Sequence, residues 1–276
     1  MEALKTLLHL TGGELLKLRS KRVTWLALAM VVAIPVGVEL LLGWAYPRDA
    51  VLPRSANTLL DGSVLQSIAL TATVVSVIAL GRDYELGTAR AFLGRGVKRH
   101  EFVLSKVLAT EVICVVGGVA YVSCTLLATV VGHTIMSDVP LAEAAGTALA
   151  SRALAAGAVI VLAAFVTAGV VNAALVAGRS SSMGLLAGLG YFLVDFCACY
   201  MVAPDAELRR YSVTCQAGCL LERWSGHQAG TYTSSLLTGA CFGTPGQSLA
   251  WLLLLGGGFT LAAVLLFRRQ DVTSGG

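Results

Sequence analysis

The sequence predicts an all-α polytopic membrane protein with six transmembrane helices in a single domain, residues 1–276. Hydrophobic residues make up 56% of the chain and charged residues only 13%, and the mean hydropathy is +0.78. This balance is too apolar for a soluble domain and is typical of membrane proteins. Six stretches reach the roughly 20 apolar residues that a helix needs to cross the hydrocarbon core: 23–46, 63–81, 106–132, 153–177, 183–203 and 249–267.

The segment 1–22, which precedes the first span, is polar and charged. The first span lacks a small-residue cleavage site like that of a signal peptide, so we expect it to be retained. Five leucines at helical spacings predict an amphipathic helix on the inner membrane surface, with a break near Gly12 and Gly13: Leu4, Leu7, Leu8, Leu15 and Leu18. An ordinary basic anchor for the first span is the alternative.

The distribution of lysine and arginine predicts which side of the cell membrane the loops occupy. Six spans place both termini on one side, and cytoplasmic termini put 14 basic residues inside: Lys5, Lys17, Arg19, Lys21, Arg22, Arg82, Arg90, Arg95, Lys98, Arg99, Lys106, Arg179, Arg268 and Arg269. Only six then lie outside: Arg48, Arg54, Arg152, Arg209, Arg210 and Arg223. Since cytoplasmic loops carry the excess of basic residues, both termini and the loop 82–105 are expected in the cytoplasm.

The loop 82–105 is expected to contain a short helix at the membrane surface. Asp83 is placed as its N-cap, and Glu85 suits the positive end of the helix dipole. Gly94 and Gly96 would end the helix, and the third span begins beyond Val97. The alternative is a solvated loop whose positive charge serves only to fix the topology.

The residue order in this loop resembles that of permease subunits of type 2 ATP-binding cassette exporters. Glu85, Gly87, Thr88 and Arg90 form the pattern ExGTxR, which is followed by a basic cluster and then by Lys106. The six spans, the amphipathic N-terminal helix and the extended region before the last span also match that family. In place of a proline often found after the helix, this chain has the residues from Gly94 to Val97.

The resemblance implies that the loop is a coupling helix that docks onto a separate ATPase subunit. The residues assigned to docking are Asp83, Glu85, Gly87, Thr88, Arg90, Arg95, Lys98 and Arg99. It also implies two permease chains, identical or different, with two ATPase subunits that bind ATP and Mg. The cargo is not indicated.

No catalytic motif competes with this interpretation. The chain has no GxxxxGK[ST] phosphate-binding loop, HExxH motif or GxSxG elbow. We therefore expect no enzyme activity, cofactor or metal in this chain, and no nucleic-acid partner. The alternative function is an intramembrane enzyme or a metal-handling membrane protein that uses the outer cysteines.

The outer loop 204–248 is long enough to form short helices that cap the bundle, and the segment from Leu208 to Trp224 has helical spacing. A disulfide is expected among Cys215, Cys219 and Cys241, since the outer compartment is oxidising, but the pairing is open. A thiolate metal site that includes His227 is the alternative.

Polar residues inside the spans are candidates for the cargo path: Glu39, Asn172 and Asp195. For Asp195 a cavity-facing or interhelical contact is expected, and a purely structural hydrogen bond or a protonated acid is the alternative. Gly184 and Gly188, four residues apart, predict close helix packing.

Overall fold

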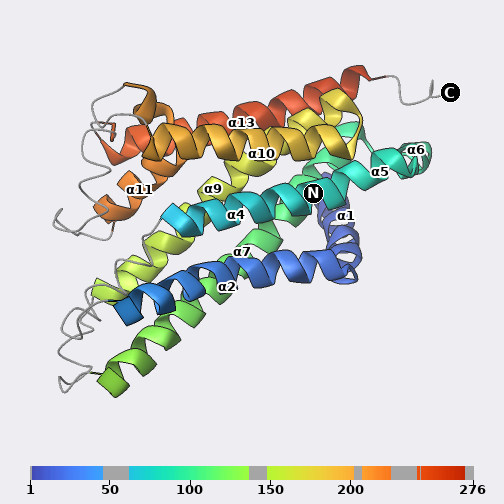
Figure 1. Cartoon of the computed structure of the whole chain (residues 1–276). Helices are drawn as coiled ribbons and strands as arrows, with labels where there is room; N and C mark the ends of the chain where they lie inside the picture. The colour runs from blue at the N-terminus through green and yellow to red at the C-terminus, as the bar shows by residue number, and fades with distance from the viewer. Residues whose placement is uncertain are drawn as a thin grey trace.

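The computed structural model describes residues 2–45, 62–136, 148–201, 207–224, 241–242 and 244–270. Every regular element within these ranges is a helix (Figure 1). Helix α1 (Glu2–Arg19) is continuous, so the predicted break near Gly12 and Gly13 is wrong. Helix interiors tolerate glycine when neighbouring turns continue the hydrogen-bond ladder. In Figure 1, α1 lies across one end of the bundle, and α2 (Arg22–Ala45) runs along it.

The second expected span is a helix whose hydrogen-bonding pattern changes toward the loop end of the chain segment. Helix α4 (Gly62–Ser76) continues into the π-helical turn η2 (Val77–Gly81) and then into α5 (Arg82–Glu85). Gly87, with φ of +66°, takes the left-handed conformation that lets the chain turn into α6 (Thr88–Gly94). Gly96 is also left-handed, and the long helix α7 (Arg99–Met136) follows. The predicted end of the loop helix at Gly94 is confirmed, but the single predicted helix is two, because Gly87 separates α5 from α6.

The second half of the chain supplies the centre and the opposite end of the bundle. Helix α9 (Ala148–Gly178) lies against α4, α7, α10, α11 and α13 and is the central helix of the packing. The remaining elements are α10 (Ser181–Tyr200), the 3₁₀ turn η3 (Glu207–Tyr211), α11 (Val213–Trp224) and α13 (Pro245–Arg269). The helical prediction for Leu208 to Trp224 is confirmed by η3 and α11.

Capping residues fix where two of these helices begin. The Ser180 hydroxyl accepts a hydrogen bond from the Met183 amide at the start of α10. Thr244 and Gln247 form a reciprocal capping box at the start of α13, with Pro245 in its first turn. The two predicted close-packing glycines are also borne out, because a Cβ atom on Gly184 would clash with Leu175 and one on Gly188 would clash with Thr73.

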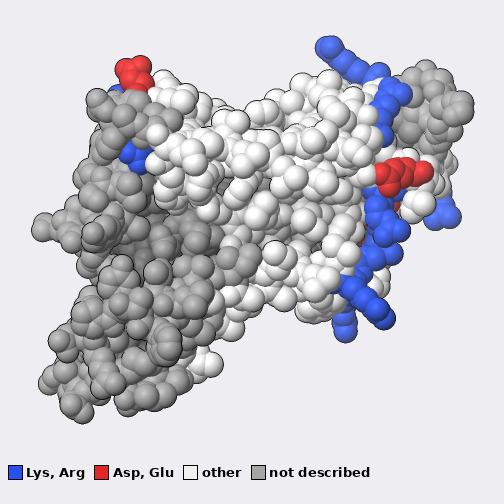
Figure 2. Space-filling view, viewed as in Figure 1, with Lys and Arg blue, Asp and Glu red and all other residues white. Residues whose placement is uncertain are grey.

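Within the described residues, five helices are long and apolar enough to cross a membrane: Leu65–Glu85, Arg99–Cys124, Ala153–Gly178, Ser181–Tyr200 and Pro245–Arg269. The expected first span corresponds to α2, of 24 residues, whose part from Arg22 to Ala33 is apolar. The fold is thus all-helical and suited to a polytopic membrane protein, and the count of six spans stays a prediction. Figure 2 shows an uncharged middle with lysine and arginine gathered at the right-hand end.

Candidate functional site

Two ends of the bundle carry the polar chemistry of the described residues. We call one the loop end: α1, α5, α6, the start of α7 and the end of α13. The other is the cap end: the last turns of α10, η3, α11 and the start of α13. In Figure 1 the loop end is on the right and the cap end is on the upper left.

The loop end is built around four buried or half-buried charged residues, which we call the charge cluster: Glu14 and Lys17 from α1, Asp83 from α5 and Lys106 from α7. The Lys106 ammonium, whose side chain is 1% exposed, pairs with both Asp83 Oδ2 and Glu14 Oε1. Lys17 Nζ lies 2.6 Å from Asp83 Oδ1 and 3.4 Å from Glu14 Oε2. Two acids therefore face two lysines, and the cluster is neutral when all four are ionised.

The surroundings of the cluster complete its hydrogen bonding and exclude water. The Thr88 hydroxyl, in the first turn of α6, donates to Asp83 Oδ1 at 2.9 Å. Lys106 Nζ lies 4.9 Å from the centre of the Phe102 ring and 5.9 Å from that of Phe92, which adds cation–π attraction. Asp83 is not the N-cap that the sequence predicted, because Gly81 holds that position and the Asp83 carboxylate turns inward to the lysines.

Lys17 is the member of the cluster that lies partly at the surface. Burial alone lowers the pKa of Lys17, but the hydrogen bond to Asp83 and the negative charges of Glu14 and Asp83 outweigh burial and raise that pKa. The ammonium form of Lys17 is therefore favoured. Through it, α1 is held against the loop by an ion pair that persists at neutral pH.

Further contacts fasten the loop to the rest of the bundle. The Ser181 hydroxyl at the start of α10 donates to Glu85 Oε1. The Arg99 guanidinium donates to the backbone carbonyls of Arg268 and Gln270, both at 2.7 Å, and so caps the end of α13. The Tyr84 hydroxyl donates to Gln270 Oε1 at 3.3 Å. The loop thus contacts both the start of α10 and the end of α13.

The outward face of the loop differs from its inward face. Ala89 is buried, and Phe92 and Leu93 pack against the core. Leu86, between α5 and α6, is 65% exposed, and Glu85, Gly87, Arg95 and Lys98 are exposed around the loop. Of the predicted docking residues, Asp83 is buried, Thr88 and Arg99 are half-buried, and the Arg90 side chain lies outside the described residues.

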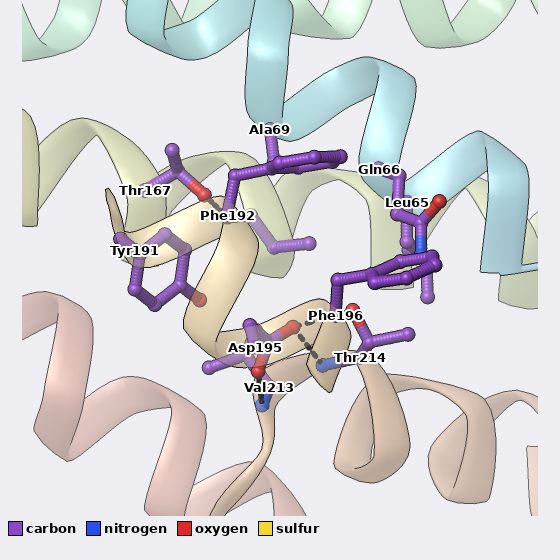
Figure 3. Close-up of a pocket in the computed structure, with 11 residues that line it drawn as sticks. Leu65, Gln66, Ala69, Thr167, Tyr191, Phe192, Asp195, Phe196, Val213 and Thr214 are labelled. Atoms are coloured by element: carbon purple, nitrogen blue, oxygen red, sulfur yellow. Dashed lines mark hydrogen bonds between the residues drawn. The ribbon is translucent and has the colours of Figure 1, made fainter. Parts of the chain in front are cut away.

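At the cap end, the Asp195 side chain of α10 lies against the start of α11. Its carboxylate accepts hydrogen bonds from the Val213 amide at 2.7 Å, the Thr214 amide at 3.0 Å and the Thr214 hydroxyl at 2.5 Å (Figure 3). The expected interhelical contact is therefore present, and it is a helix cap supplied from another helix. Asp195 also lines a cavity of about 10 Å³, near the smallest volume that holds one water.

The other two polar candidates do not join Asp195 in the described part of the chain. The Asn172 side chain is fully buried in α9, and neither of its amide atoms has a hydrogen-bond partner among the described residues. The Glu39 side chain lies outside those residues, although its backbone belongs to α2. A cargo path through these residues stays a prediction.

The cysteines at the cap end form two close pairs. Cys219 and Cys241 are joined in a disulfide, which resolves the pairing that the sequence left open. Cys215 is not part of that bond, and its sulfur lies 2.8 Å from the sulfur of Cys199 in α10. Among the described residues no group of three or more His, Cys, Asp or Glu side chains is placed to hold a metal ion.

Sequence reasoning missed the charge cluster as a unit. Within their own segments, Glu14 and Lys17 belong to a charged stretch that precedes the first span, and Lys106 follows the basic cluster of the loop. The available signal was the position of Lys106 inside an apolar helix, since a charge there requires a partner. Nothing in the sequence named that partner.

The fold defines a helical, membrane-embedded class of protein with a charged, structured loop at one end. No protein-family model matches the chain, and no curated protein shows significant similarity to it.

Proposed function

We propose that this chain is the membrane-spanning permease subunit of an ATP-binding cassette exporter and that α5 and α6 dock onto a separate ATPase subunit. The observation that carries the proposal is a short helical loop with an exposed apolar tip, fixed to the bundle by buried ion pairs. The residues Glu85, Gly87, Thr88 and Arg90, which resemble the coupling helix of type 2 exporters, lie in this loop.

A coupling element must pass on a movement rather than absorb it. The charge cluster connects the loop to α1 through Lys17 and to α7 through Lys106. Contacts from Glu85 to Ser181 and from Arg99 to the end of α13 add two further helices. A force applied to α6 would therefore be distributed to four parts of the bundle, which supports a role in transmitting ATPase closure.

The exposed face of the loop has the composition of a docking surface. Leu86 presents a large apolar side chain at the tip, and Glu85, Arg95 and Lys98 supply both signs of charge around it. An apolar anchor that becomes fully buried, with charged groups at its rim, is the usual arrangement of binding energy at protein interfaces.

Two independent features support a cytoplasmic position for the loop end. The basic residues of the described chain lie mainly there, whereas Arg209, Arg210 and Arg223 lie at the cap end and Arg152 lies near the start of α9. The disulfide between Cys219 and Cys241 at the cap end suits an oxidising compartment outside the cytoplasm.

The proposal is tested by mild detergent extraction of the full chain from its native membrane, followed by quantification of the ATPase subunit that co-purifies. We expect Leu86→Ser to reduce the bound ATPase about tenfold or more, because an apolar anchor of this size contributes about 1.5–3 kcal/mol when buried. Leu16→Ser is the matched control, since Leu16 is 68% exposed at the same end of the molecule but outside the loop.

Both variants should keep the wild-type melting temperature, because neither side chain packs in the core. If the wild-type chain brought down no ATPase, or if the two variants lost it equally, the docking role of the loop would be wrong.

A further inference from the structure

We propose that Cys199 and Cys215 form a second disulfide of the mature protein, which joins α10 covalently to α11. The two sulfur atoms are 2.8 Å apart, within 1 Å of the about 2.05 Å bond length of a disulfide. Both side chains are buried, Cys199 at 2% exposed and Cys215 at 0%. The inference rests on the orientation in the proposed function, because it requires an oxidising compartment at the cap end.

The register between the two helices is set independently of the sulfur atoms. Asp195 accepts hydrogen bonds from the backbone amides of Val213 and Thr214, which fixes the first turn of α11 against α10. Cys199 follows Asp195 by four residues and so lies on the same face of α10. Cys215 directly follows Thr214, and the three hydrogen bonds at Asp195 therefore bring the two thiols together.

The chemical setting of Cys215 suits the attacking thiol. Its backbone amide donates to the Ser212 hydroxyl at 3.2 Å in the first turn of α11, where the helix dipole favours a thiolate.

The bond would form by thiol–disulfide exchange with an oxidised dithiol protein of the outer compartment. The Cys215 thiolate attacks the partner disulfide and releases one partner thiol, which gives a mixed disulfide. The Cys199 thiolate then attacks the Cys215 sulfur and releases the second partner thiol. Two electrons and two protons leave the cysteine pair and reduce the partner disulfide. Because both thiols are buried in the folded chain, the exchange precedes the packing of α11 onto α10.

Together with the bond between Cys219 and Cys241, the second disulfide would hold α11 from two sides. Cys215 and Cys219 are four residues apart on this helix. One bond ties α11 to α10, and the other ties it to the residues just before α13. The cap end would then be a covalently closed unit, whatever movement takes place at the loop end.

The experiment counts free thiols in the full chain after denaturation in excess N-ethylmaleimide without reductant, directly from native membranes, by intact mass and peptide mapping. Of the seven cysteines, three should carry the label: Cys114, Cys124 and Cys197. Five labels, including Cys199 and Cys215, would overturn this proposal and leave the orientation and the proposed function untouched. Seven labels would overturn both this proposal and the outer position of α11.

Two variants of α10 separate the pair from its neighbours. Cys199→Ser should free Cys215, so that Cys215 gains a label in addition to the wild-type three. Cys197→Ser, two residues away at an exposed position, is the matched control and should keep the pair oxidised while losing its own label. An unlabelled Cys215 in the Cys199→Ser variant would show a different partner and would overturn the pairing.

Discussion

Two acids inside the bundle, the buried Asp83 at the loop end and the half-buried Asp195 at the cap end, are satisfied by different kinds of partner. Asp83 is neutralised by the ammonium groups of Lys17 and Lys106 and by the Thr88 hydroxyl. Asp195 is satisfied by two backbone amides and a hydroxyl at the start of α11. One acid is matched by full charges from distant helices, and the other by neutral donors at a helix N-terminus.

This difference separates a long-range connection from a local one. The two lysine partners of Asp83 are 66 and 23 residues away in the chain, whereas the partners of Asp195 are 18 and 19 residues away. Opposite charges attract over longer distances than neutral hydrogen bonds do, and their loss leaves an uncompensated buried charge. The loop end is therefore expected to depend more strongly on single residues than the cap end, where a disulfide adds a covalent constraint.

The largest expected effect follows from removing the central lysine of the charge cluster. Lys106→Met keeps the length of the side chain but leaves Asp83 and Glu14 buried with Lys17 as their only cation in the cluster. Breaking a buried ion pair on one side typically costs about 3–5 kcal/mol. We expect a large fall in the melting temperature of the detergent-solubilised full chain, measured by a thermal shift assay.

Two further variants show whether this effect is electrostatic. Lys98→Met should change the melting temperature little, because Lys98 is 66% exposed and lies 4.0 Å from Glu101. Adding Glu14→Gln to Lys106→Met restores one negative charge to one positive charge, and the double variant should be more stable than Lys106→Met alone. If the double variant were the less stable of the two, charge imbalance would not explain the loss.

The cap end was more predictable from the sequence than the loop end. Apolar runs of sufficient length located the span helices, and helical spacing located α11. Asp195 was marked by its position inside an apolar segment, and its partners lie in the next element of the chain. The sequence identified Cys219 and Cys241 as disulfide candidates, but it could not pair them because pairing depends on how α11 turns against α13.

At the loop end, the spacing of polar and apolar residues predicts which helix faces are polar, but it does not predict which helices pack against each other. Glu14 and Asp83 look like ordinary surface charges within their own segments, and the position of Lys106 in an apolar helix signals a partner without identifying it. Their partnership arises because α1 folds back across the bundle and packs against α7, a tertiary contact with no local signal. The break predicted at Gly12 and Gly13 is wrong for a related reason. Buried residues before and after these glycines pack α1 against the bundle and keep the helix continuous.

A smaller effect is expected when Asp195 is replaced by asparagine. Asp195→Asn keeps the shape but converts one acceptor oxygen into a donor, so an amide of Val213 or Thr214 loses its partner. Leaving one buried donor unsatisfied costs about 1–3 kcal/mol. Thr214→Val, which removes only the hydroxyl donor, should cost less, and thermal shift assays of both variants measure the order. Equal losses from the two variants would mean that the backbone amides do not depend on Asp195.

The smallest expected effect is the pH dependence that Lys17 gives to the loop end. The pKa of Lys17 is raised in the folded chain above its usual 10.5, so its stabilising contribution is complete below that pH and is lost as the pH rises through the folded value. Because the Lys17 side chain is 30% exposed, the contribution is at most about 1 kcal/mol. Raising the pH above 10.5 should therefore lower the melting temperature of the wild type more than that of Lys17→Arg, because a guanidinium keeps its proton throughout this range. The same alkaline decline in both proteins would show that the ion pair between Lys17 and Asp83 does not contribute to stability there.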